Sequence, residues 1–81
     1  VILVVGMRLG CLNHALLTQR AVAASGCRLA AWVANALEGG MPEGYGEALT
    51  ERLDAPCLGT IPAMSSVAMA ADILDLRVLD A

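Results

Sequence analysis

Short apolar runs alternate with stretches of helical spacing along the chain. Residues 1–5, VILVV, are all apolar and predict a strand that is covered on both faces. After a loop over residues 6–11, apolar residues recur at three-and-four spacing and predict a helix over 12–25, which ends at Gly26. The apolar run 28–34 then predicts a second strand.

The second half of the chain repeats this alternation. Pro42 suits the first position of a helix, which would have Leu49 and Leu53 on its inner side. The run CLGTI, residues 57–61, predicts a third strand, and a serine-capped helix is expected to extend through residues 69–74. The order is therefore strand–helix, three times.

This order predicts an α/β fold with a parallel sheet and right-handed crossovers, forming one domain or part of one over residues 1–81. All three strands then end at the same edge of the sheet, where ligands of such folds bind. The polar segments placed at that edge are residues 8–13 after the first strand, Asn35 after the second, and residues 60–62. We expect a site there.

Composition removes several classes of function. The net charge is −3 and the five basic residues are scattered arginines, which argues against nucleic-acid binding. No apolar run is long enough to span a membrane. Three cysteines without a metal-binding spacing suggest reduced thiols in a cytoplasmic protein and no metal site in this chain.

The chain contains no lysine, which excludes a complete Walker A phosphate loop. Any phosphate-binding loop is therefore expected outside these residues. A start at VILVV, with no initiator methionine, also suggests a fragment of a longer protein.

The helix start after the first strand is a candidate anion site. Its free N–H groups and partial positive charge could receive a carboxylate through backbone donors. The candidate donors are Leu9, Gly10, Cys11 and Leu12. An ordinary strand-to-helix turn, with glycines that tolerate its backbone, is the alternative.

Three other side chains have two interpretations each. The Asn35 amide could complement an adenine edge or simply form a turn. His14 is the only histidine, but no acid or nucleophile lies beside it, so a backbone hydrogen bond or a subunit contact is favoured over catalysis. Tyr45 could donate to a ligand or pack as a structural residue, and Trp32 is expected in the core.

GMRLGCLNHALLT, at residues 6–18, resembles the signature of the dethiobiotin synthetases, and WVAN and GTIP follow in the order of that family. The resemblance covers essentially the whole chain, as roughly the C-terminal third of the enzyme. It implies a homodimeric P-loop NTPase-like fold that binds ATP and Mg²⁺. The phosphate loop, catalytic lysines and metal ligands of that family belong to the N-terminal part, so the resemblance implies no catalytic residue here and an inactive isolated chain.

The resemblance also implies a reaction. In this family, a ligase of biotin biosynthesis, carbon dioxide forms a carbamate on one amine of diaminopelargonic acid, ATP phosphorylates it, and the second amine closes the ureido ring. The turn from Leu9 to Asn13, including Gly10, Cys11 and Leu12, would hold the distal carboxylate of the diamine across the dimer, and Tyr45 would donate to it.

The nucleotide contacts follow from the same resemblance. Asn35 would read adenine, while Ile61 and Pro62 would line the base. The sequence departs from the family after GTIP, because AMSSVAMA lacks the acidic residue that relatives often carry there.

Two other hypotheses remain. The chain could belong to another P-loop group, such as the partition ATPases or cobyric acid synthases, although these are not expected to carry the residue 6–18 signature. It could also be a non-catalytic α/β interaction module that pairs with another protein through its uncovered sheet.

Overall fold

The computed structural model describes residues 1–36, 43–62 and 67–80. Strands and helices alternate through this part of the chain, which confirms the predicted order. A short 3₁₀ helix at the end, η1, was not predicted. The elements are β1 (Ile2–Met7), α1 (Cys11–Ala24), β2 (Ala31–Ala36), α2 (Tyr45–Arg52), β3 (Cys57–Ile61), α3 (Val67–Ile73) and η1 (Leu76–Asp80).

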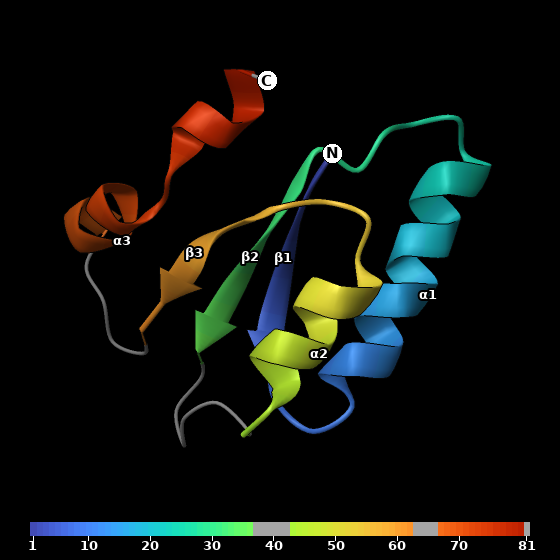
Figure 1. The fold of residues 1–81 in the computed structure, drawn as a ribbon, viewed down its shortest axis with the longest axis horizontal. Helices are drawn as coiled ribbons and strands as arrows, with labels where there is room; N and C mark the ends of the chain where they lie inside the picture. Colours follow the sequence, from blue (N-terminus) through green and yellow to red (C-terminus); the bar gives the residue numbers. More distant parts are fainter. Residues whose placement is uncertain (37–42, 63–66, 81) are drawn as a thin grey trace.

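The three strands form a parallel sheet in the order β1-β2-β3, with β2 in the centre. Helices α1 and α2 lie on one side of the sheet, and α3 with η1 lies on the other (Figure 1). Each side has its own apolar cluster. The α1–α2 side buries Val5, Met7, Cys11, Ala15, Trp32, Ala34, Leu49 and Leu53, and the other side buries Ala31, Val33 and Leu58.

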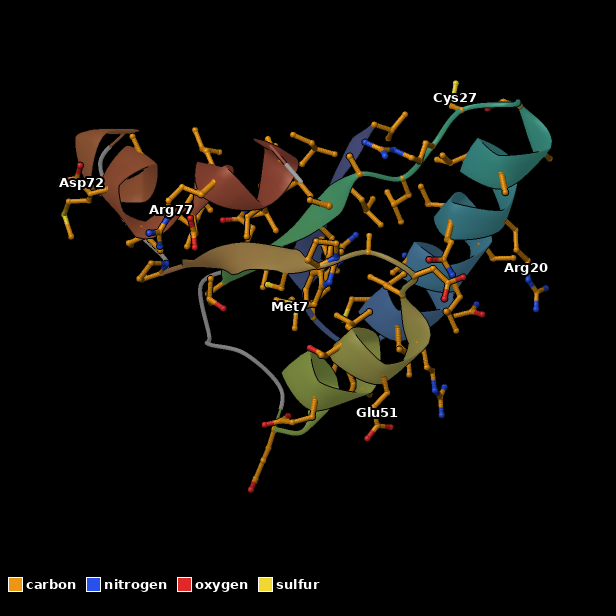
Figure 2. The ribbon with its side chains drawn as sticks, turned by 45° about the horizontal axis from the view of Figure 1, so that its top comes forward. Met7, Arg20, Cys27, Glu51, Asp72 and Arg77 are labelled. Carbon is orange, nitrogen blue, oxygen red and sulfur yellow. The ribbon has the colours of Figure 1, made fainter. Side chains whose placement is uncertain are left out.

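Strand β1 ends later than predicted. It continues through Gly6 and Met7, because these two residues pair with Asn35 and Ala36 of β2. Met7 is fully buried and lies between the sheet and the helices α1 and α2 (Figure 2).

The expectation that β1 is covered on both faces is wrong for this chain. Ile2 is 46% exposed and Val4 is 60% exposed, and by strand alternation both lie on the face away from α1. Strand β1 is also an edge strand of the sheet described here. Its outer face is therefore apolar and is left uncovered by the residues that the structure describes.

Strand β2 begins three residues after the predicted start and extends to Ala36. Trp32 is 1% exposed, which confirms its predicted place in the core. Asn35 was expected after the strand, but it lies within β2, paired with Gly6 on one side and Ile61 on the other. Its backbone is therefore fixed by the sheet, and the turn interpretation is wrong.

Helix α2 begins at Tyr45, whereas the sequence indicated a start at Pro42, which lies outside the described residues. The cap is Gly44, whose φ of 81° is left-handed, a conformation that glycine adopts without a steric cost. Leu49 and Leu53 are buried, as predicted for the inner side of this helix.

Strand β3 has the predicted bounds, but its pairing with β2 is interrupted. Trp32 pairs with Cys57 and Val33 with Gly59, so Leu58 is an extra residue, as in a β-bulge. The serines expected to cap the last helix lie outside the described residues, and α3 ends at Ile73.

Candidate functional site

The turn between β1 and α1 presents an uncapped helix start at the carboxyl edge of the sheet. Gly10 is the N-cap, with a left-handed φ of 90°, and no side chain caps the helix. The Cys11 N–H donates to the Arg8 carbonyl at 3.0 Å, and the His14 N–H donates to the Gly10 carbonyl at 3.2 Å. Within the described part of the chain, the N–H groups of Leu12 and Asn13 have no acceptor.

The side chains of this turn divide between core and solvent. Cys11 is 3% exposed and belongs to the core, so its thiol faces away from any ligand at the surface. Leu9 is 85% exposed and Asn13 is exposed. The first turn of α1 contains no acidic residue, so nothing local opposes an anion at the partial positive charge of the helix start.

Tyr45 is the first residue of α2 and is half-buried against the α1–α2 cluster, which also receives Leu12. Helix α2 follows β2 as α1 follows β1, so both helices start at the carboxyl edge of the parallel sheet. The structure therefore brings the predicted carboxylate residues to one face of the sheet at one end. Part of the Tyr45 ring serves packing.

The predicted nucleotide residues meet on the opposite face. Asn35 and Ile61 are direct cross-strand neighbours and are both half-buried, and Pro62 follows Ile61 and is exposed. Trp32 and Ala34 point into the α1–α2 cluster, so strand alternation directs Asn35 toward the α3 side. Ile61 packs with Leu74 against the smaller cluster there.

Hollows among the described residues flank the α1–α2 side. One, of about 320 Å³, lies between β1 and α1. In addition to residues of β1, its lining comprises Arg8, Cys11, His14, Ala15 and Thr18. Another, of about 680 Å³, lies between the sheet and α2, with Glu43, Glu47 and Glu51 among its lining residues. Neither hollow is lined by Asn35 or Ile61.

His14 takes part in the helix through its backbone, and its imidazole makes none of the hydrogen bonds seen in the described residues. Its carbonyl accepts a hydrogen bond from the Thr18 hydroxyl at 2.8 Å, and its side chain is exposed. In the described residues, no group of three or more His, Cys, Asp or Glu side chains could hold a metal ion.

One polar residue that the sequence analysis did not single out joins the two helices. The Gln19 side chain of α1 accepts the Asp54 N–H at 2.7 Å and donates to the Arg52 carbonyl at 3.3 Å. The sequence gives no local signal for these hydrogen bonds, because Arg52 and Asp54 lie 33 and 35 positions after Gln19.

The parallel β-α-β-α-β-α segment, with its polar residues gathered at the carboxyl edge, defines an α/β protein of the P-loop NTPase-like kind. Helices in the described part of the chain are too short or too polar to cross a bilayer.

Known proteins give the more specific relationship. The chain is 53% identical over 83 residues to ATP-dependent dethiobiotin synthetase BioD of Janthinobacterium sp. (strain Marseille), a match to 98% of this chain and 35% of that protein. It is 51% identical to the protein of the same name in Cellvibrio japonicus (strain Ueda107) and 48% identical to that in Pseudomonas aeruginosa (strain UCBPP-PA14), again over 98% of the chain and 36% of each relative. No family model matches the chain.

The resemblance predicted from the sequence is thereby confirmed: this chain matches a C-terminal portion of dethiobiotin synthetases. It spans about a third of the length of these relatives.

Proposed function

We propose that the complete protein is an ATP-dependent dethiobiotin synthetase and that residues 1–81 are the C-terminal part of its single P-loop-type α/β domain. The observation that carries this proposal is the identity of 53% over 98% of the chain to a relative of that name. The reaction is the closure of the ureido ring of dethiobiotin from diaminopelargonic acid, carbon dioxide and ATP, and the expected location is the cytoplasm.

The start of α1 binds the distal carboxylate of the diamine. A small anion-binding site forms here from the unengaged N–H groups of Leu12 and Asn13, the left-handed Gly10 and the exposed amide of Asn13. We call this site the carboxylate seat. Leu9 borders this seat, and Cys11 supports it from the core. Tyr45 donates its phenol to the same carboxylate from the start of α2.

Asn35 binds the adenine of ATP. An amide that is held in a strand offers one donor and one acceptor in fixed positions, which complements an adenine edge. Ile61 and Pro62 provide apolar contact for the base beside it. ATP, when bound, supplies the phosphoryl group, and the phosphate loop and the ligands of Mg²⁺ lie outside this chain.

The placement of the two sets supports a homodimer with shared active sites. The carboxylate seat lies on the α1–α2 side of the sheet and Asn35 on the α3 side. Within one subunit, the sheet would therefore separate a diamine held in the carboxylate seat from an ATP held at Asn35. A two-fold dimer resolves this, because the seat of one subunit faces the nucleotide of the other.

This chain acts in the reaction by binding and orientation. Holding the carboxylate far from the amines contributes binding energy without joining the chemistry, and it aligns the carbamate with the phosphoryl donor. The chain has no lysine to stabilise charge on that phosphoryl group. The isolated chain is therefore expected to be inactive.

An interaction module without catalysis is the second candidate. The exposed apolar face of β1, with Val4 at 60%, favours it. A complete protein that extends the sheet beyond β1 accounts for the same exposure, and the identity to the synthetases favours that explanation.

A charge substitution tests the proposal in the full-length protein. Gly10→Asp and Asn13→Asp place a negative charge against the incoming carboxylate, so each should raise the KM for the diamine about tenfold or more and leave ATP binding unchanged. Gly10→Asn is the matched control, since asparagine has the size of aspartate and tolerates a left-handed φ. An equal effect of Asp and Asn in steady-state assays would contradict the carboxylate seat.

A further inference from the structure

The Gln19 amide ties α1 to the carboxyl end of α2. Its Oε1 accepts the Asp54 N–H at 2.7 Å, and its Nε2 donates to the Arg52 carbonyl at 3.3 Å. Gln19 itself is half-buried. We call this pair of contacts the Gln19 clamp.

Both partners of the clamp are backbone groups at the end of a helix. Arg52 is the last residue of α2, where carbonyls lack intrahelical partners, and Asp54 follows the C-cap residue Leu53. Glutamine is suited to this position because one amide donates and accepts at once. The clamp therefore fixes α1 against one particular residue of α2.

Apolar packing alone fixes the position of α1 along α2 less closely than the Gln19 clamp does. Ala15 of α1 and Leu49 of α2 share the same core cluster, but hydrophobic contact is non-directional and tolerates sliding. Hydrogen bonds depend on distance and angle, so the clamp specifies the position of one helix along the other.

The two helices extend nearly equal lengths from the clamp to their starts. Gln19 lies eight residues after Cys11, the start of α1, and Arg52 lies seven residues after Tyr45, the start of α2. At about 1.5 Å per residue, these segments measure about 12 Å and about 10.5 Å. Both begin at the same edge of the sheet (Figure 1). If α1 slides along α2 at the clamp, the distance between the two helix starts therefore changes by a similar amount.

We propose that Gln19 is a positioning residue for substrate binding, which sets the spacing between the carboxylate seat and Tyr45. It does so without touching the substrate. This inference rests on the proposed function, because it assumes that the seat and Tyr45 hold the same carboxylate.

The test uses the full-length protein with four single variants, at Gln19, Arg20 and Tyr45, and the double variant of Gln19→Ala with Tyr45→Phe. Gln19→Ala removes both bonds, and Gln19→Glu keeps the acceptor for the Asp54 N–H. Arg20→Ala is the matched control, because Arg20 is the next residue on α1 and points away from α2 into solvent (Figure 2). Tyr45→Phe removes only the phenol oxygen. Steady-state kinetics gives kcat and the KM for each substrate, and thermal unfolding gives the stability.

Gln19→Ala should raise the KM for the diamine about three- to tenfold, with kcat and the KM for ATP unchanged. Gln19→Glu should restore part of the loss, and Arg20→Ala should resemble the parent protein. In the Tyr45→Phe background, Gln19→Ala should have a clearly smaller effect on the KM for the diamine. The Tyr45 phenol oxygen, whose position Gln19 sets, is already absent from that variant.

A purely structural role gives another pattern: a lower unfolding temperature and a reduced active fraction, with an unchanged KM and no coupling to Tyr45. That pattern, in Gln19→Ala or in the milder Gln19→Glu, would overturn the positioning role while Tyr45→Phe still raises the KM. If neither Tyr45→Phe nor Gly10→Asp changes the KM for the diamine, the proposed carboxylate site is itself wrong, and the role of Gln19 is lost with it.

Discussion

Asn35 is surrounded by backbone on both sides at the carboxyl edge of the sheet. Gly6 and Ile61 are its neighbours on β1 and β3, and its side chain is half-buried. Gly6 contributes no side chain on the α3 side of the sheet next to Asn35. This position suits an amide that contacts a flat ligand.

Replacing Asn35 tests its proposed role. In the full-length protein, Asn35→Ala should raise the KM for ATP and change that for the diamine little. Loss of one partner from a buried hydrogen-bonded pair costs about 1–3 kcal/mol, which corresponds to roughly a five- to hundredfold change. Binding of ATP and the kinetics of both substrates measure the effect.

A different outcome would contradict adenine binding by Asn35. Unchanged ATP kinetics together with a lower unfolding temperature would show that the amide supports only the sheet. Asn35→Asp, of nearly the same size, serves as the control for shape.

At the scale of elements, β3 and α3 meet closely at Gly59. Its φ is 152°, and a Cβ at this position would lie 3.2 Å from the Ile73 carbonyl oxygen and 3.4 Å from the Ile73 Cγ2. The bulge at Leu58 thus coincides with the point where α3 ends against the strand. Only glycine satisfies both the backbone and the space.

Gly59→Ala should therefore destabilise the full-length protein by about 1–3 kcal/mol, through backbone strain and crowding together. Gly44→Ala is the matched control, because its φ of 81° is also positive but nothing lies within 4 Å of its added Cβ. Chemical denaturation should show the larger loss for Gly59→Ala. Equal losses would mean that α3 moves aside without cost.

Local patterns in the sequence predicted the order of elements, the parallel sheet and the bounds of β3. They placed the end of β1 too early, because only pairing with β2 extends the strand through Met7. They placed Asn35 after its strand for the same reason. The start of α2 depends on a left-handed Gly44, whereas proline at Pro42 gave the stronger local signal.

The candidate site was predictable only in part. The signature at residues 6–18 pointed to the turn, and alternation along β2 could have placed Asn35 opposite to it. The clamp through Gln19 depends on contacts across more than 30 residues and has no local pattern.

At the scale of the whole molecule, the proposed sharing of active sites across a dimer predicts complementation between inactive subunits. One variant of the full-length protein carries Gly10→Asp and Asn13→Asp, and the other lacks the lysine of its phosphate loop. Each homodimer should be nearly inactive. A mixed dimer, isolated with two different tags, should regain activity at one of its two sites, because that site combines an intact loop with an intact seat.

Mixed dimers that assemble and bind ATP but stay as inactive as their parents would show that the seat does not act across the interface. A dimer of two unmodified but differently tagged subunits controls for the effect of the tags. The assay is dethiobiotin formation per dimer.

The opposite orientation of neighbouring side chains on β2 also matters for engineering. Ala34 points into the α1–α2 cluster, while Asn35 points to the other side of the sheet. Under the proposed assignment of the two sites, substitutions aimed at nucleotide preference lie on one face of the sheet, and substitutions aimed at the accepted diamine lie on the other. We expect two variant libraries, one at Asn35 and Ile61 and one at Asn13 and Tyr45, to be selectable separately and then combined with little loss from either.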